Sequence, residues 1–130
     1  MKRLATVIFL TALLLSGCKE QPSVKLVTQI SVDWEPGAMT EDRVYRDDGK
    51  IQRVLNRMRQ LGQRYRPDVD PEQLLSPSVL ITVNFNDGSH HRYQLKGDRY
   101  IRSDSHHWQQ ADAEKIQRLQ FLLKALPGDG

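Results

Sequence analysis

Two pairs of adjacent histidines are the residues of this chain best suited to bind a metal: His90–His91 and His106–His107. Neutral imidazole is a common ligand of transition metals. Adjacent residues of a strand point to opposite faces, so a site would need one histidine from each pair, such as His90 and His106. That site has two nitrogens and no obvious third ligand, although Asp104 lies nearby in the sequence. We therefore favour solvated or partly packed histidines and expect no cofactor.

The segment Asp104-Ser105-His106 contains the residue types of a hydrolase triad. Members of a triad must converge through the fold, and neighbours in a turn rarely present that geometry. The sequence also lacks the nucleophile-elbow pattern of serine hydrolases. We therefore expect a protein that is not an enzyme.

The only cysteine, Cys18, follows an apolar segment at residues 4–15, which Lys2 and Arg3 precede. This segment is shorter than the about 20 residues that a helix needs to span a bilayer. A positive head, a short apolar core and a small-residue exit are typical of a secretion signal. An uncleaved signal anchor and a buried N-terminal helix are the alternatives. The buried helix is disfavoured because residues 4–15 have no polar face beyond two threonines.

The last four residues of this signal, Leu15-Ser16-Gly17-Cys18, resemble the lipobox of bacterial lipoproteins. The resemblance implies that the Cys18 thiol takes a diacylglycerol and that the signal, residues 1–17, is cut just before it. The protein is then expected outside the cytoplasm, lipid-anchored to the cell membrane or the outer membrane. Lys19 follows the cysteine, and by the same resemblance the absence of aspartate there permits the outer membrane.

The chain that remains after cleavage is close to neutral. The full sequence of 130 residues has 19 basic and 16 acidic residues, and removal of Lys2 and Arg3 leaves 17 and 16. An exported, near-neutral chain is a poor partner for nucleic acid, so we expect none. With one cysteine it forms no internal disulfide. Residues 18–23 are polar and predict a tether, and residues 24–128 have the size of one domain.

Alternating apolar residues predict a strand over residues 24–34 with one buried face. The residues expected on that face are Val24, Leu26, Ile30, Val32 and Trp34, and Thr28 breaks the alternation. Residues 43–45 predict a further short strand.

Two segments have apolar residues at helical spacing. The first, residues 50–64, follows the potential N-caps Asp47 and Asp48, and the second follows Asp112. The apolar faces comprise Ile51, Val54, Leu55, Met58 and Leu61 in the first helix, and Ile116, Leu119, Leu122, Leu123 and Leu126 in the second. Residues 66–77, which contain three prolines and three acids, predict a surface loop between the first helix and the next strand.

Residues 79–85 are rich in β-formers, and the turn at residues 86–88 places Gly88 at the left-handed position of a three-residue hairpin loop. The hairpin pairs Val79, Ile81, Val83 and Phe85 with Leu95, Tyr93, His91 and Ser89. The opposite face then carries Leu80, Thr82, Asn84, His90, Arg92 and Gln94. The turn at residues 96–98 leads to another strand at residues 99–102, and residues 107–109 predict a last short one.

These elements predict an α+β fold: a two-layer sandwich with a mainly antiparallel sheet of four to five strands and two helices packed on one face. The other face of the sheet stays open and more polar. Thr82, Asn84, His90, Arg92 and Gln94 on that face are the candidate binding residues.

A basic stripe, Lys50, Arg53, Arg57 and Arg64, flanks the first helix. We interpret it as a solvated flank, with contact to anionic lipid headgroups as the alternative. The hypothesis for the whole chain is a small non-enzymatic binding or envelope-assembly lipoprotein whose partner is a protein or an envelope polymer. The alternatives are an inhibitor or sensor that binds a hydrolase or a peptide by strand addition or through the loop at residues 66–77, and a metal-binding lipoprotein that uses the histidines.

Overall fold

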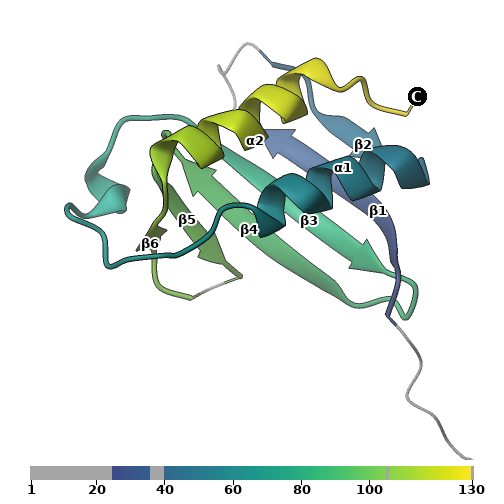
Figure 1. Ribbon diagram of the computed structural model, residues 1–130, viewed down its shortest axis with the longest axis horizontal. Helices are drawn as coiled ribbons and strands as arrows, with labels where there is room; N and C mark the ends of the chain where they lie inside the picture. The colour runs from purple at the N-terminus through teal and green to yellow at the C-terminus, as the bar shows by residue number, and fades with distance from the viewer. Residues whose placement is uncertain (1–24, 36–39, 105, 130) are drawn as a thin grey trace, which may run out of the picture.

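The computed structural model describes residues 25–35, 40–104 and 106–129 (Figure 1). Its strands are β1 (Val27–Trp34), β2 (Arg43–Tyr45), β3 (Ser78–Phe85), β4 (His90–Lys96), β5 (Tyr100–Ser103) and β6 (Gln109–Gln110). Its helices are α1 (Asp48–Arg59), the single-turn η1 (Pro71–Gln73) and α2 (Ala113–Ala125). Among the described residues, no helix has the length and apolar character that crossing a bilayer requires.

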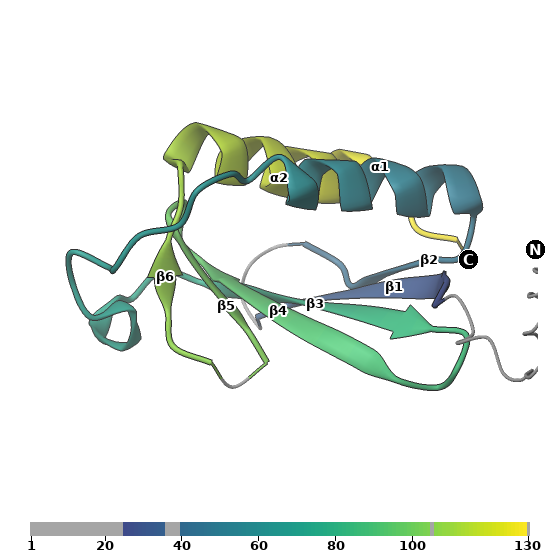
Figure 2. The ribbon, with the colours of Figure 1, turned by 60° about the horizontal axis from the view of Figure 1, so that its bottom comes forward.

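The strands form one antiparallel sheet in the order β2-β1-β3-β4-β5-β6. Both long helices lie on the same face of it, side by side and in opposite directions (Figure 2). The predicted α+β sandwich is therefore confirmed. The sheet has six strands rather than four to five, because β2 and β6, with only three and two residues, both pair at its edges.

The hairpin of β3 and β4 has the predicted register, with Thr82 opposite Arg92 and Asn84 opposite His90. Its turn closes with a hydrogen bond from the Phe85 amide to the Ser89 carbonyl at 2.9 Å. Gly88 adopts φ +88°, the left-handed conformation that glycine reaches without steric cost.

One predicted face is wrong at the start of β1. Leu26 was expected in the core but is 59% exposed, whereas Val27 packs against the core. The cause is an irregularity of the pairing between Val27 and Gln29, which switches the side chains that precede Thr28 to the other face. Val24 lies outside the described residues.

The two helices cover the sheet with the predicted apolar faces. Ile51, Val54 and Leu61 are buried, and Leu55 and Met58 pack partly buried against them. All five apolar residues predicted for α2 are buried. The first helix ends at Arg59, within the periodic segment of residues 50–64, and the chain turns just after it at Gly62, with φ +76°.

Strand β2 caps the C-terminal end of α2. The buried hydroxyl of Tyr45 shares its one proton between the carbonyls of Leu123 at 3.2 Å and Leu126 at 2.8 Å. The Arg43 side chain donates to the carbonyls of Leu123 and Lys124 at 3.1 and 3.0 Å. These carbonyls belong to the last turn, which has no partners within the helix.

The chain after α2 returns to the start of α1. The carboxylate of Asp129 accepts from the Asp47 amide and from the Lys50 ammonium, both at 2.7 Å. The Asp129 amide donates to the Val44 carbonyl at 2.7 Å, on the outer edge of β2. We call Arg43, Tyr45, Lys50 and Asp129 the end-capping cluster. It fixes α1, α2 and β2 relative to one another.

Candidate binding groove between the helices

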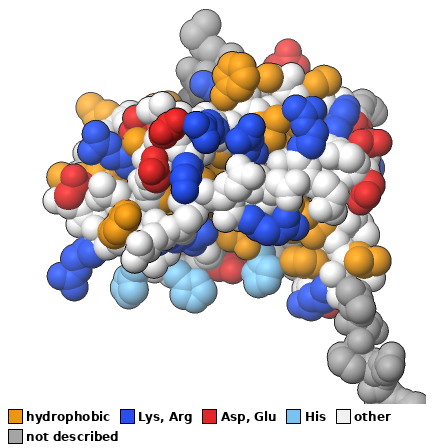
Figure 3. Space-filling model, viewed as in Figure 1, with side chains coloured by type: hydrophobic (Ala, Val, Ile, Leu, Met, Phe, Trp, Pro, Cys, Tyr) orange, Lys and Arg blue, Asp and Glu red, His pale blue; other side chains and the backbone are white. Residues whose placement is uncertain are grey.

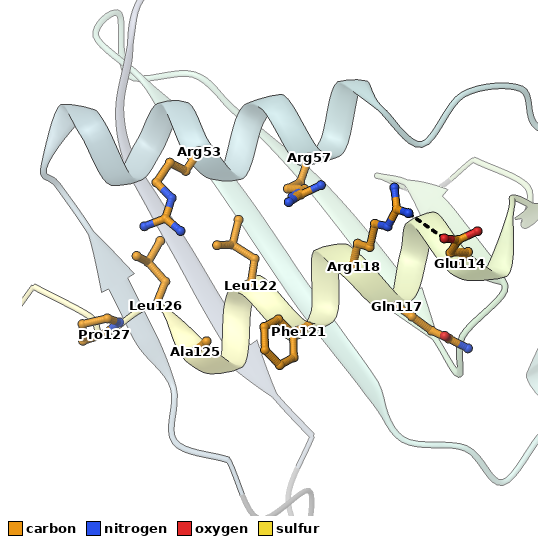
Figure 4. A pocket seen from close by; sticks show the side chains of 10 residues that line it. All are labelled: Arg53, Arg57, Glu114, Gln117, Arg118, Phe121, Leu122, Ala125, Leu126 and Pro127. Carbon is orange, nitrogen blue, oxygen red and sulfur yellow. Dashed lines mark hydrogen bonds and ion pairs between the residues drawn. The ribbon is translucent and has the colours of Figure 1, made fainter.

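The outward faces of α1 and α2 enclose a groove with a volume of about 450 Å³ (Figure 4). Figure 4 shows Arg53 and Arg57 reaching from α1 toward α2, and Leu122 reaching from α2 toward α1. The groove is lined by Arg53, Arg57, Glu114, Gln117, Arg118, Phe121, Leu122, Ala125, Leu126 and Pro127.

The groove is apolar along α2. Leu122 and Leu126 turn toward the core and are 8% and 6% exposed, so they contribute only their edges. Phe121 lies on the outer side of the same helix and is 74% exposed. A ligand that covers this exposed phenyl ring removes its apolar surface from water, which favours binding by on the order of 25 cal/mol per Å².

The groove is cationic along α1. Arg53 and Arg57 are four residues apart and therefore share one side of the helix. Arg57 donates to the Gln60 side chain at 3.3 Å. In the part of the chain that the structure describes, neither arginine forms an ion pair. Arg118, across the seam on α2, does so with Glu114 at 2.6 Å, an exposed pair that contributes little to stability.

The groove continues toward the C-terminal end of α1. A second hollow of about 430 Å³ shares Arg57 and Arg118 with the first, and a third of about 250 Å³ shares Arg53, Arg57 and Leu122. The charged residues that line the three hollows are five cations, Arg53, Arg57, Arg59, Lys115 and Arg118, and one carboxylate, Glu114. Lysine and arginine side chains gather over this layer in Figure 3. Such a surface suits an elongated ligand that is both anionic and apolar.

Only part of the basic stripe identified from the sequence lies in the groove. Arg53 and Arg57 line the groove, but Lys50 binds Asp129 and the Pro127 carbonyl instead. Arg64 lies past the end of α1, beside the loop that begins at residue 66. Sequence reasoning missed Phe121 as part of a site. Its position, out of step with the apolar face of α2, is the signal that could have identified it.

The candidate residues of the open sheet face do lie together. Cross-strand pairing places Thr82 beside Arg92, Asn84 beside His90, and Gln94 beside Arg102 on the next strand. The side chain of Gln94 accepts from Arg102 Nε at 3.0 Å. His90 and Arg92 are exposed, whereas Thr82, Asn84 and Gln94 are half-buried. This face is a pleated surface of mixed polar groups.

The loop at residues 66–77 packs against one end of the sheet. Glu72 lies 3.4 Å from Arg102 and accepts from Trp108 Nε1 at 3.1 Å, and the Arg102 guanidinium stacks over the Trp108 ring at 4.6 Å. The Tyr100 hydroxyl donates to Asp68 at 2.6 Å. This hydrogen bond lowers the pKa of Asp68 and raises that of Tyr100. The loop is thus attached at two carboxylates.

The four histidines are the candidate metal ligands of the sequence. The described residues contain no group of three or more histidine, cysteine, aspartate or glutamate side chains that could hold a metal ion. Nδ1 of His106 lies 2.9 Å from the Ser103 carbonyl, and Nδ1 of His91 lies 3.4 Å from Asp104. Hydrogen bonds from the Arg92 amide and from His91 lower the pKa of Asp104. Ser105, the middle residue of the potential triad, lies outside the described residues.

Cys18, the predicted lipidation site, and residues 1–17, the predicted signal, also lie outside the described residues, so both assignments rest on the sequence. No protein-family model, curated protein or solved structure that we compared with the chain matches it. The candidate site therefore rests on its geometry and chemistry.

Proposed function

We propose that this protein is a lipid-anchored, non-enzymatic binding module outside the cytoplasm, and that the groove between α1 and α2 holds its partner, a protein or an envelope polymer. The groove carries the proposal. It combines an exposed phenyl ring with two arginines that have no carboxylate partner among the described residues. Neither feature helps the fold, and both favour association with an anionic partner that has an apolar side.

The lipobox supports the location. The described chain begins at Lys25, seven residues after Cys18. Seven extended residues span at most about 25 Å, so an acylated Cys18 would hold the domain close to the membrane surface. Lys25 lies 3.8 Å from Asp87 in the β3–β4 turn, and the Asn86 amide donates to the Leu26 carbonyl at 2.8 Å. The segment that carries the anchor would therefore join the domain beside the β3–β4 turn.

Strand addition has little support, because both edges of the sheet carry covering segments. The Asp129 amide donates to Val44 on β2, and Tyr65 and Gln110 exchange two hydrogen bonds of 2.8 Å beside β6. Such covering is how proteins protect sheet edges from pairing with other chains. One observation favours the alternative function, a hydrolase inhibitor that acts through a loop. Leu75 stands fully exposed on the attached loop at residues 66–77.

A photo-crosslinking experiment in cells separates the candidate surfaces. A benzophenone amino acid replaces Phe121 in the groove, Arg92 on the open sheet face, or Leu75 on the loop, each in the full chain. We expect an adduct from position 121, and we expect Arg53→Glu/Arg57→Glu to abolish it. An adduct from position 92 or 75 alone would move the binding site to that surface. Labelling with a fatty-acid analogue tests the anchor, and equal labelling of Cys18→Ser and the parent would refute lipidation.

A further inference from the structure

We infer that the groove between α1 and α2 binds an acidic amphipathic helix of a partner protein, an inference that rests on the proposed function. The occupant would lie along the two helices as a third one. Helix-in-groove recognition of this kind places an apolar stripe on a groove floor and uses the flanks for specificity.

The dimensions of the groove favour a helix. Its lining residues extend along α2 from Glu114 to Leu126, which is about 18 Å at about 1.5 Å per helical residue. A partner helix of three turns has this length. The three hollows join along the seam because they share Arg57. A compact ligand would fill one hollow and leave the others empty.

The α2 side of the groove has the spacing that a helix can match. Arg118, Phe121, Leu122 and Ala125 occupy positions i, i+3, i+4 and i+7 of α2, so they form one continuous strip. Phe121 is the one large, well-exposed apolar side chain of the strip. A leucine stripe with the same spacing on a partner would bury it.

The charges select an acidic partner. Arg53 and Arg57 are one helical turn apart, so two glutamates at i and i+4 of the partner can reach both. Five cations against one carboxylate along the seam would repel a basic helix. An anionic bilayer offers the same charge, but it is flat. The edges of Leu122 and Leu126 lie between two helices, where a partner helix can reach them and a flat surface cannot.

Designed peptides test the inference directly. The probe is a fluorescent peptide of about 18 residues, long enough for partial helicity, with leucines at i, i+3, i+4 and i+7 and glutamates on both flanks. One control replaces the glutamates by lysines, and another keeps the composition but scrambles the stripe. Binding to the full chain in a neutral detergent is followed by fluorescence anisotropy. We expect the acidic amphipathic peptide to bind at least about tenfold more tightly than either control.

Variants of the protein locate the binding. Arg53→Glu/Arg57→Glu should weaken the acidic peptide at least about tenfold and improve the lysine peptide, and Phe121→Ala should weaken both. Arg92→Glu is a single charge reversal on the open sheet face, and we expect it to leave the affinities unchanged. Circular dichroism melts check that each variant is folded. We expect melts close to the parent's, because all four substituted side chains lie at the surface.

Equal binding of the acidic, basic and scrambled peptides would overturn the inference. So would binding to vesicles of anionic phospholipid that Phe121→Ala and Arg53→Glu/Arg57→Glu abolish, while no peptide binds. If the peptides fail but crosslinking from position 121 succeeds in cells, the occupant is not an acidic helix and the proposed function stands. If both fail, the groove is not the binding site.

Discussion

Removal of one hydroxyl, in Tyr45→Phe, tests whether the end-capping cluster holds α2 on the sheet. Tyr45 is 0% exposed and its hydroxyl meets two carbonyls at the end of the helix. Burial raises the pKa of this phenol, so at neutral pH the hydroxyl keeps the proton that it donates.

Loss of the hydroxyl affects the two carbonyls differently. Leu123 keeps its hydrogen bond from Arg43 at 3.1 Å, whereas the Leu126 carbonyl loses the hydrogen bond that it accepts from Tyr45 at 2.8 Å. A buried carbonyl left without a hydrogen bond costs about 1–3 kcal/mol, and phenylalanine fills the rest of the space. We therefore expect Tyr45→Phe to lower the free energy of unfolding by about 1–3 kcal/mol.

Urea unfolding followed by tryptophan fluorescence measures this loss, because Trp34 and Trp108 report on different parts of the domain. Tyr65→Phe is the matched control: its side chain is exposed, and we expect a change within about 0.5 kcal/mol. A Tyr45→Phe protein as stable as the parent would refute the reasoning. The Leu126 carbonyl would then find water or another donor without cost, and the cluster would not hold the helix.

Three further predictions concern the core, the carboxylate of Asp129 and the proposed anchor. Leu119→Ala should lower the free energy of unfolding by about 2–5 kcal/mol and Leu55→Ala by less, because Leu119 is fully buried and Leu55 only half-buried. Urea unfolding of the two variants under the same conditions gives their order of stability. The reverse order would show that the helical faces are misassigned. The hydrogen bond from Lys50 contributes most, and those from the Asp47 and Arg46 amides add to it, in lowering the pKa of Asp129 from 3.8 to about 2. The ionised carboxylate therefore contributes its full stabilisation above pH 3.8, and this stabilisation is lost as the pH falls toward 2. Asp129→Asn should remove this part of the acid dependence in melts over that range, and identical profiles for the two proteins would contradict it. Cys18→Ser should leave the folded domain intact, as a near-parental melt would show, because the described core begins at Val27, nine residues after Cys18.

The periodicities of the sequence predicted most of the fold. The alternation over residues 79–95 fixed the register of β3 and β4, because a slip by one residue would have moved Val83 and Ile81 to the solvent side. The capping aspartates Asp47 and Asp112 marked the start of each helix. The sequence did not predict that Leu26 would point outward. Thr28, which interrupts the apolar alternation, lies where the pairing is irregular. A polar residue at an apolar position does not by itself reveal that a strand contains an extra residue.

The groove could not be found from the sequence, because it depends on how two helices separated by half the chain lie against each other. Helical spacing placed Arg53 and Arg57 on one flank of α1, but it could not say whether that flank faced water or α2. The end-capping cluster decides this. Arg43 and Tyr45 hold the end of α2, and Asp129 holds the start of α1, so the two helices lie antiparallel with the arginines on the seam. Each of these contacts joins residues about 80 positions apart, and no local pattern encodes them. The cluster that stabilises the helix layer is therefore also what shapes the candidate binding site.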